Sequence, residues 1–231
     1  MKNMKSLFFS GCSYTFGDEL DDKFNKRFSK LVSDHYECSH FNMAECGYSN
    51  DAIVRKSIKY LESNKPDVVV IQFTVISRVE YFTNRGQIQN WAVQSHKANR
   101  GNTNVNRYYI SVYNKILGCE NFWKNVFLFD SYCKSRGIKY VSLVADHFDP
   151  VLRRPEKHYH IINGFGDHNN IGYWKTLCDG IHPFFLHYNL LGDVRDSSSW
   201  SNYTHGKNGG HPTVKGHQLI AEKVIDLIDH I

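Results

Sequence analysis

The chain has 231 residues, with 28 Lys and Arg against 23 Asp and Glu, and a formal net charge of +5. Hydrophobic residues make up 41% of the sequence and charged residues 22%, which excludes collagen, a coiled coil and intrinsic disorder as its main state. A single domain of this length buries a full core, so its stability does not require a disulfide or a metal.

The sequence indicates a protein of a reducing, cytoplasmic compartment with no membrane span. Its longest apolar run, around residues 68–73, is far shorter than the ~20 residues that a spanning helix needs. The start of the chain lacks the apolar core and cleavage site of a signal peptide, and the six cysteines include no Cys-x-x-Cys pair, so we expect free thiols. The mild and scattered positive charge argues against nucleic-acid binding, and the sequence does not indicate an oligomeric state.

Strand and helix signals alternate through the first half of the chain. Residues 6–10 form a short apolar run that ends at Gly11, which indicates a buried strand. The run over 68–74 is rich in β-branched residues and apolar on both faces, as expected of a central parallel strand. Between these runs the pattern predicts a helix around 24–32, a weak strand at 39–42, and a helix from Ser49 or Asn50 to 61.

The second half carries fewer regular signals. Residues 78–105 are polar and irregular, and residues 146–205 are a long, loop-rich insertion with many His, Asn and aromatic residues. The predicted regular elements are a helix over 106–136 with Gly137 as its C-cap, a buried strand over 138–144, and a final helix from Thr213.

This alternation predicts a single α/β domain spanning residues 1–231. Its expected architecture has three layers and a flavodoxin-like parallel sheet of four or five strands. In such sheets the functional site lies beyond the carboxyl ends of the strands. The segments after Phe9, Asn42, Thr74 and Val144 are therefore the places to search for chemistry.

Three of these places carry candidate residues. Ser13 follows the first strand in a Gly-Cys-Ser turn, where its hydroxyl and nearby backbone N–H groups would face the same space. Gly47 follows the second strand and offers an N–H that no side chain shields. His211 precedes the last helix and could act as a general base toward a hydroxyl within about 3 Å. Taken singly, these residues are better explained as a helix N-cap, an ordinary strand-to-helix turn and a solvated His.

Taken together, their order resembles that of the SGNH (GDSL-like) hydrolase family. Gly11-Cys12-Ser13 stands at the family's nucleophile block, with Cys12 in place of the usual Asp. Gly47 matches its oxyanion-hole glycine, and Asn208-Gly-Gly-His211-Pro212 matches the Asp-x-x-His-Pro block before the last helix. The resemblance implies that Ser13 is the nucleophile and His211 the base, and that the N–H groups of Ser13 and Gly47 hold the oxyanion.

Two departures from the family's pattern bear on activity. Thr74 stands where the family has an oxyanion-binding Asn, and its hydroxyl, or the Gln72 amide nearby, would have to donate instead. The loss of one oxyanion donor typically costs ~10²–10³ in rate. Asn208 stands where the family has an acid, and an amide cannot neutralise an imidazolium. Asp179, Asp193 or Asp196 would have to supply the missing carboxylate.

A second candidate base lies upstream of His211. Asp179-Gly-Ile-His182-Pro183 is a complete Asp-x-x-His-Pro, although no final helix follows it. We favour His211 because its block leads directly into the last helical pattern. Asp179 and His182 remain the alternative pair.

The sequence therefore predicts a serine ester hydrolase that works through an acyl-enzyme without a cofactor. The resemblance implies a small O-acyl ester, either an acetylated sugar or a lipid ester. Arg78 could bind an anionic group of the substrate, and Gln72 is a second candidate for substrate binding. The His and Asp residues of 146–187 fit no metal-ligand spacing, so we expect no metal. The alternative is a catalytically weak or inactive module on the same fold that binds an acylated glycan or a partner protein.

Overall fold

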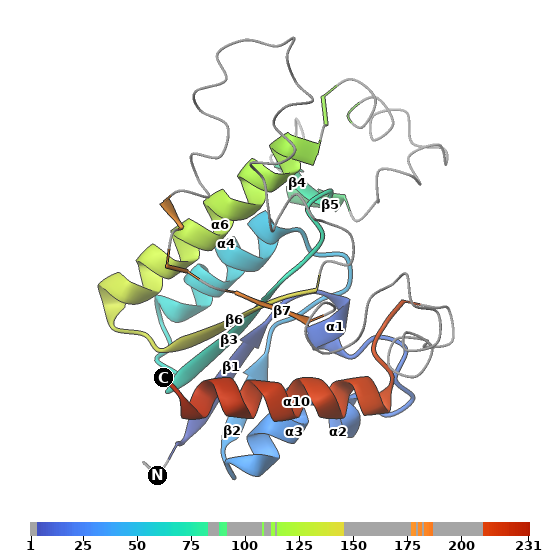
Figure 1. Ribbon diagram of the computed structural model, residues 1–231, viewed down its shortest axis with the longest axis vertical. Helices are drawn as coiled ribbons and strands as arrows, with labels where there is room; N and C mark the ends of the chain where they lie inside the picture. The colour runs from blue at the N-terminus through green and yellow to red at the C-terminus, as the bar shows by residue number, and fades with distance from the viewer. Residues whose placement is uncertain are drawn as a thin grey trace.

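A parallel five-stranded sheet forms the centre of the computed structural model (Figure 1). Its strands lie in the order β2-β1-β3-β6-β7, and every neighbouring pair is parallel. Their bounds are Ser6–Ser10 for β1, Ser39–Asn42 for β2, Val68–Phe73 for β3, Tyr140–Val144 for β6 and Phe184–Phe185 for β7. β2 is added on one side of β1, and β3, β6 and β7 are added on the other side. This strand order confirms the expected α/β fold with a flavodoxin-like sheet.

The structure describes only part of the chain. The described residues are 4–82, 88–91, 108, 112–113, 115–145, 177–178, 180–181, 183–186 and 210–231. Asp179, His182 and Asn208 lie outside these ranges, as does most of the predicted insertion over 146–205.

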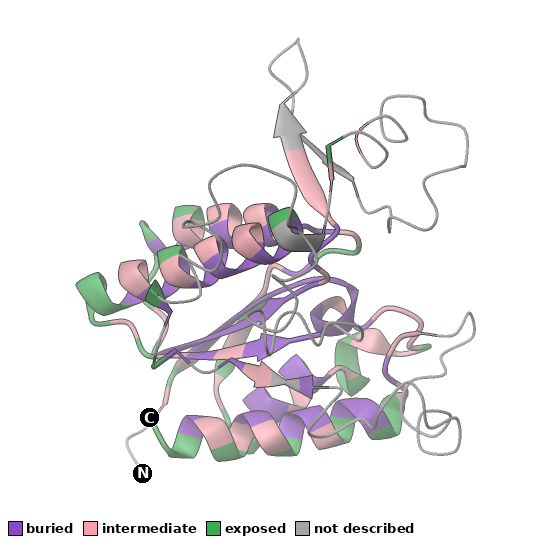
Figure 2. Cartoon of the chain, turned by 45° about the horizontal axis from the view of Figure 1, so that its top comes forward, coloured by how far each residue is buried: buried purple, intermediate pink, exposed green. Residues whose placement is uncertain are grey.

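Helices cover both faces of the sheet. α4 (Asn50–Leu61) and α6 (Lys115–Arg136) pack together on one face, and α3 (Phe28–His35) and α10 (Val214–Asp229) pack together on the other (Figures 1 and 2). The short helices α1 (Ser13–Phe16) and α2 (Lys23–Lys26) connect β1 to α3. Figure 2 shows the buried sides of the four long helices turned toward the sheet.

The strands divide their side chains between two cores. Phe8 of β1 belongs to the cluster beneath α4 and α6, whereas Leu7 and Phe9 belong to the cluster beneath α3 and α10. All six residues of β3 are buried, so the prediction of a central strand that is covered on both faces is confirmed. α4 begins as predicted, because the Ser49 hydroxyl accepts a hydrogen bond from the Ala52 N–H.

Three sequence predictions need correction. The segment after β3 contains an antiparallel hairpin, β4 (Val79–Phe82) and β5 (Ile88–Trp91), where only irregular chain was expected. Arg55 of α4 binds Glu80 through two hydrogen bonds, and this tertiary contact, which the sequence does not reveal, anchors β4. The helix predicted over 106–136 is interrupted: residue 108 is helical and α6 spans Lys115–Arg136, but 112–113 are not helical, and both of their N–H groups donate to the Tyr108 carbonyl. The fifth strand, β7, lies within residues 146–205, which the sequence predicts to be a loop-rich insertion.

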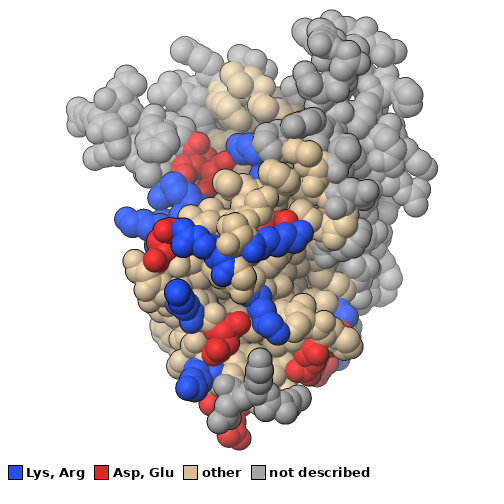
Figure 3. All heavy atoms as spheres, turned by 90° about the vertical axis from the view of Figure 1, so that its left-hand side faces the viewer, with Lys and Arg blue, Asp and Glu red and all other residues tan. Residues whose placement is uncertain are grey.

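Two further features concern the surface and the thiols. All six cysteines are free, as expected. Among the described residues, no helix is both long and apolar enough to cross a membrane. On the face drawn in Figure 3, basic and acidic side chains are interspersed, so this face has no continuous patch of one sign.

Candidate active site

Four segments meet where the strands of the sheet end. We call them the serine turn (residues 10–17, after β1), the glycine turn (43–49, after β2), the β3 end (72–78) and the histidine loop (210–213, before α10). The carboxyl ends of the strands point toward α1, and the chain enters α10 from the same side (Figure 1). This is the edge at which the sequence predicts the site.

Ser13 is the first residue of α1, at the helix end where backbone N–H groups have no partner within the helix. Its side chain is 4% exposed, and its hydroxyl donates to Cys12 Sγ at 3.8 Å. Gly11 lets this turn pass close to β3, because a Cβ there would lie 2.4 Å from Thr15 Oγ1 and 2.8 Å from Gln72 Oε1. A glycine at this position is therefore a packing requirement of the turn.

Gln72 holds the serine turn against β3. Its buried Oε1 accepts hydrogen bonds from the Cys12 N–H at 3.2 Å and the Thr15 hydroxyl at 3.0 Å, and its Nε2 donates to the Phe73 carbonyl at 2.5 Å. These bonds fix the orientation of the amide, with its oxygen toward the turn. The amide that the sequence suggested for substrate binding is thus bonded to the protein itself.

The glycine turn is joined to both of its neighbours. Gly47 has a φ of 83°, in the left-handed region that glycine tolerates best. The Glu45 N–H donates to the Gly11 carbonyl at 3.3 Å, which ties this turn to the serine turn. Asn50 binds both backbone groups of Thr74, since its Oδ1 accepts from the Thr74 N–H at 2.8 Å and its Nδ2 donates to the Thr74 carbonyl at 3.1 Å. Asn50, three residues after Gly47, thus ties the start of α4 to the β3 end.

Arg78 brings a positive charge to this framework. Its Nη1 donates to Thr74 Oγ1 at 3.0 Å and to the Tyr48 carbonyl at 3.4 Å. Burial acts to raise the pKa of the Cys12 thiol, but the charge of Arg78 and hydrogen bonds, including one from Thr74, outweigh it and leave that pKa lowered. The environment beside Ser13 therefore favours negative charge.

His211 lies against the serine turn and the residues that follow it. The Tyr14 hydroxyl donates to the Gly210 carbonyl at 2.8 Å, and the Tyr14 and His211 rings meet edge to face with centroids 5.8 Å apart. His211 Nδ1 lies 2.9 Å from Glu19 Oε1, and Nε2 lies 3.8 Å from Asp18 Oδ2. The distance between Glu19 Oε1 and His211 Nδ1 is that of an ion pair, but the angle at this contact is not that of a hydrogen bond.

The structure brings most of the predicted site residues to one edge of the sheet. The bonds described above join the segments that carry Ser13, Gly47, Thr74, Gln72 and Arg78, although Ser13 and Gly47 themselves take part in none of those bonds between segments. His211 joins them through Tyr14, the residue after Ser13. Among the described residues, the Ser13 hydroxyl is bonded to Cys12 and not to an imidazole, so the choice of base stays a prediction.

Glu19 is the residue of this region that sequence reasoning missed. The signal was an acidic pair, Asp18-Glu19, directly after the serine turn. It was not informative by itself, because acidic residues in a turn are usually solvated. Only the folded chain shows that one of them is directed at His211.

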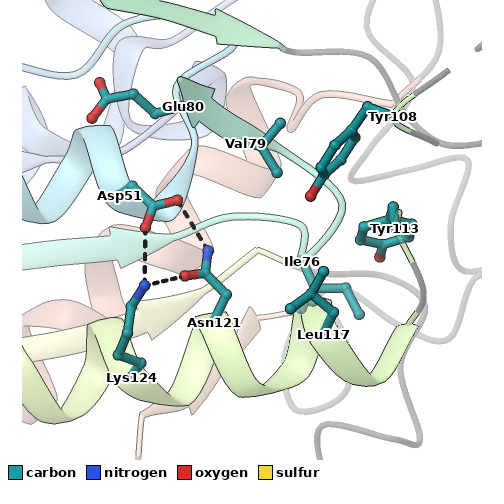
Figure 4. Close-up of a pocket in the computed structure, with 10 residues that line it drawn as sticks. Asp51, Ile76, Val79, Glu80, Tyr108, Tyr113, Leu117, Asn121 and Lys124 are labelled. Carbon is teal, nitrogen blue, oxygen red and sulfur yellow. Dashed lines mark hydrogen bonds and ion pairs between the residues drawn. The ribbon is translucent and has the colours of Figure 1, made fainter. Parts of the chain in front are cut away.

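A pocket of about 390 Å³ opens beside the glycine turn, where α4 and α6 begin. One side of it is polar: Asp51 accepts from Asn121 at 3.0 Å and lies 3.6 Å from the Lys124 ammonium (Figure 4). The other side carries Tyr108 and Leu117, along with Tyr113 and Ile76. Of the four segments of the candidate site, the described lining of the pocket includes only the β3 end, through Ile76, and Asp51 lies two residues after the glycine turn.

Comparison with known proteins supports the fold assignment. No protein-family model matches the sequence, and no curated protein matches it either. A solved structure from Desulfitobacterium hafniense, described as belonging to the G-D-S-L family of lipolytic proteins, matches with a TM-score of 0.56 at 12% identity and covers 96% of this chain and 98% of its own. A lipolytic G-D-S-L family member from Veillonella parvula matches with a TM-score of 0.52 at 10% identity, covering 99% and 100% of the two chains. The psychrotrophic esterase EstA from Pseudoalteromonas matches with a TM-score of 0.52 at 12% identity, covering 98% and 97%.

The chain therefore has the α/β fold of the GDSL, or SGNH, lipolytic proteins and esterases. At these identities the similarity defines the architecture. The chemistry has to be argued from the residues of this chain.

Proposed function

We propose that the protein is a serine ester hydrolase that acts on a small O-acyl ester. The observation that carries the proposal is the convergence of the serine turn, the glycine turn, the β3 end and the histidine loop at the carboxyl edge of the sheet. In this fold, that arrangement provides a nucleophile, oxyanion donors and a base from four separate segments.

In the proposed reaction, His211 accepts the proton of the Ser13 hydroxyl as Oγ attacks the ester carbonyl. The tetrahedral intermediate collapses, the alcohol leaves with the proton held by His211, and the acyl group stays on Ser13. Water then attacks the acyl-enzyme while His211 again accepts a proton. The carboxylic acid leaves, and Ser13 recovers its proton.

The oxyanion would be held by the N–H groups of Ser13 and Gly47 and by the Thr74 hydroxyl. Because Thr74 Oγ1 accepts a hydrogen bond from Arg78, its own proton is directed at another acceptor, and during the reaction it would turn from the Cys12 sulfur to the oxyanion. The guanidinium also polarises that hydroxyl, which strengthens it as a donor. Arg78 would thus support the position at which the family uses an Asn, in addition to the substrate-binding role that its place in the sequence suggested.

The surroundings of Ser13 favour a small acyl group, since the nucleophile is almost completely buried. We place the alcohol part of the ester in the pocket beside Asp51 and Leu117, which combines charged and apolar walls. Such a lining suits a hydroxylated alcohol with one apolar face, as a sugar has, better than a long acyl chain. An acetylated sugar is therefore the preferred form of the substrate, and a lipid ester the alternative.

The test combines covalent labelling and turnover. A fluorophosphonate probe is expected to label the wild-type protein at Ser13, and 4-nitrophenyl acetate is expected to be hydrolysed. Ser13→Ala should abolish both, whereas Ser63→Ala, a matched change at an exposed serine, should alter neither. Labelling that persists in Ser13→Ala, or a wild-type protein with neither labelling nor turnover, would refute the proposal.

A non-catalytic binding module is the second candidate. It is favoured by Asn208 in the sequence and by the contact of the Ser13 hydroxyl with Cys12. This candidate predicts binding of an acetylated oligosaccharide that is unchanged by Ser13→Ala, together with no probe adduct on the wild-type protein.

A further inference from the structure

We propose that Glu19 is the carboxylate that positions His211, in place of the acid that the sequence lacks at Asn208. The inference rests on the proposed esterase function and deepens it. It assigns the residue that orients the catalytic base to the chain just after the serine turn, which carries the proposed nucleophile.

The first observation is the geometry around the imidazole. Glu19 Oε1 lies 2.9 Å from His211 Nδ1, the nitrogen that an orienting carboxylate must hold if Nε2 is to exchange the proton. The angle falls short of a hydrogen bond. Catalytic hydrogen bonds are often poorly aligned without substrate and tighten when it binds, and at this distance a small rotation of either side chain completes the bond.

The second observation is the burial of the carboxylate. The Glu19 side chain is 10% exposed, whereas that of Asp18 is 40% exposed and lies 3.8 Å from the other ring nitrogen. A charge pair that is largely removed from solvent interacts more strongly than an exposed one. Glu19 is therefore better placed than Asp18 to stabilise the imidazolium that forms when His211 takes a proton.

The third observation is the backbone at Glu19. Its φ is 66°, in the left-handed region that few residues other than glycine adopt. Such a backbone is costly for a residue with a side chain, so at Glu19 the surrounding structure has to impose it. The left-handed turn directs this side chain back toward His211.

The local fold explains how Glu19 reaches the histidine loop. α1 has only four residues, and its C-cap is Gly17, whose φ is 82° and whose N–H donates to the Ser13 carbonyl. This immediate stop keeps Glu19 close to the start of α1. The Tyr14 hydroxyl binds the Gly210 carbonyl and holds the histidine loop against the same turn. Ser13 and Glu19 are thus positioned by one compact segment, six residues apart in the chain.

The test compares Glu19→Gln with Glu37→Gln. Glu37 also has a left-handed backbone, with a φ of 50°, but it is exposed and follows α3. Both variants replace a glutamate by glutamine, so a difference between them reports the contact of Glu19 with His211. We expect Glu19→Gln to lower kcat for 4-nitrophenyl acetate by roughly 10³- to 10⁴-fold with KM little changed, as for the loss of an orienting acid elsewhere. Glu37→Gln should leave kcat unchanged, and Glu19→Asp should recover part of the loss because it keeps the charge.

A second readout does not depend on turnover. NMR of protein labelled with ¹⁵N-histidine should show a far-downfield imidazole N–H signal, assigned to His211 by its loss in His211→Asn. The signal should disappear in Glu19→Gln and persist in Glu37→Gln. If the wild-type protein hydrolyses esters and both readouts are unchanged in Glu19→Gln, the inference is wrong while the esterase proposal stands. If the signal depends on Glu19 but no ester is turned over, the contact is supported and the proposed function fails.

Discussion

Replacing Gln72 by leucine tests whether this amide builds the serine turn or binds substrate. In the structure, Gln72 Oε1 accepts from the Cys12 N–H and the Thr15 hydroxyl, and all three groups are buried. Leucine has a similar size but no acceptor, so both of these donors lose their partner, as does the Cys12 thiol, which also donates to Oε1 at 3.4 Å. A buried donor without a partner costs ~1–3 kcal/mol, so we expect Gln72→Leu to lower the free energy of unfolding by about 2–6 kcal/mol.

A double-mutant cycle with Thr15→Val isolates the contact. Thr15→Val removes one donor and leaves Oε1 bonded to the Cys12 N–H, so alone it should cost about 1 kcal/mol. In the double variant, the loss of the Gln72 acceptor no longer leaves the Thr15 hydroxyl without a partner, because that hydroxyl is absent. The total loss should therefore be smaller than the sum of the two single losses by about 1–2 kcal/mol.

The assay is urea unfolding followed by fluorescence, with Gln218→Leu as the matched control. Gln218 is exposed on α10, and its replacement should change stability by less than ~0.5 kcal/mol. If Gln72→Leu is as stable as wild type but raises KM for the ester, the amide contacts substrate and the structural role is wrong. The hydrogen bond between Thr15 and Gln72 would also be refuted if the stability loss of the double variant equalled the sum of the two single losses to within about 0.5 kcal/mol.

Three further predictions concern pH, the oxyanion and the pocket. Burial, with the charges of His211 and Arg27, lowers the pKa of His217 to about 3. The unfolded state therefore binds this proton first, and stability should fall by about 1.4 kcal/mol per pH unit as pH drops below 6.5, a dependence absent in His217→Gln. Thr74→Val, which removes the proposed oxyanion donor without changing side-chain size, should lower kcat by ~10²-fold with KM little changed. Leu117→Trp, which narrows the pocket, should raise KM for an acetylated sugar severalfold but leave KM for 4-nitrophenyl acetate unchanged.

Each of these has a clear opposing result. Equal slopes of stability against pH between 6.5 and 5 in the wild type and His217→Gln would show that His217 is not held neutral. Full activity in Thr74→Val would remove this hydroxyl from the oxyanion hole. Equal changes in KM for both esters in Leu117→Trp would place the alcohol elsewhere.

The order and type of the main elements could be predicted from the sequence because their causes are local. The β-branched run of β3 has too few polar residues for a solvated face, so it had to be a central strand. Ser49 caps α4 through a bond that spans only three residues. Failures occurred where a distant partner decides the outcome: Glu80 in β4 is fixed by Arg55, and β7 is a strand only because it pairs with β6.

The candidate site divides in the same way. The sequence by itself determined the order of Ser13, Gly47 and His211 along an alternating α/β pattern, and this order was enough to place all three at one edge of a parallel sheet. Only the tertiary structure decided that Gln72 faces the serine turn, that Arg78 binds Thr74, and that Glu19 meets His211 across 192 positions of the chain. The physical reason is that a side chain's partner depends on packing between distant segments. A left-handed backbone at a glutamate is imposed by that packing, and residue type alone gives no sign of it.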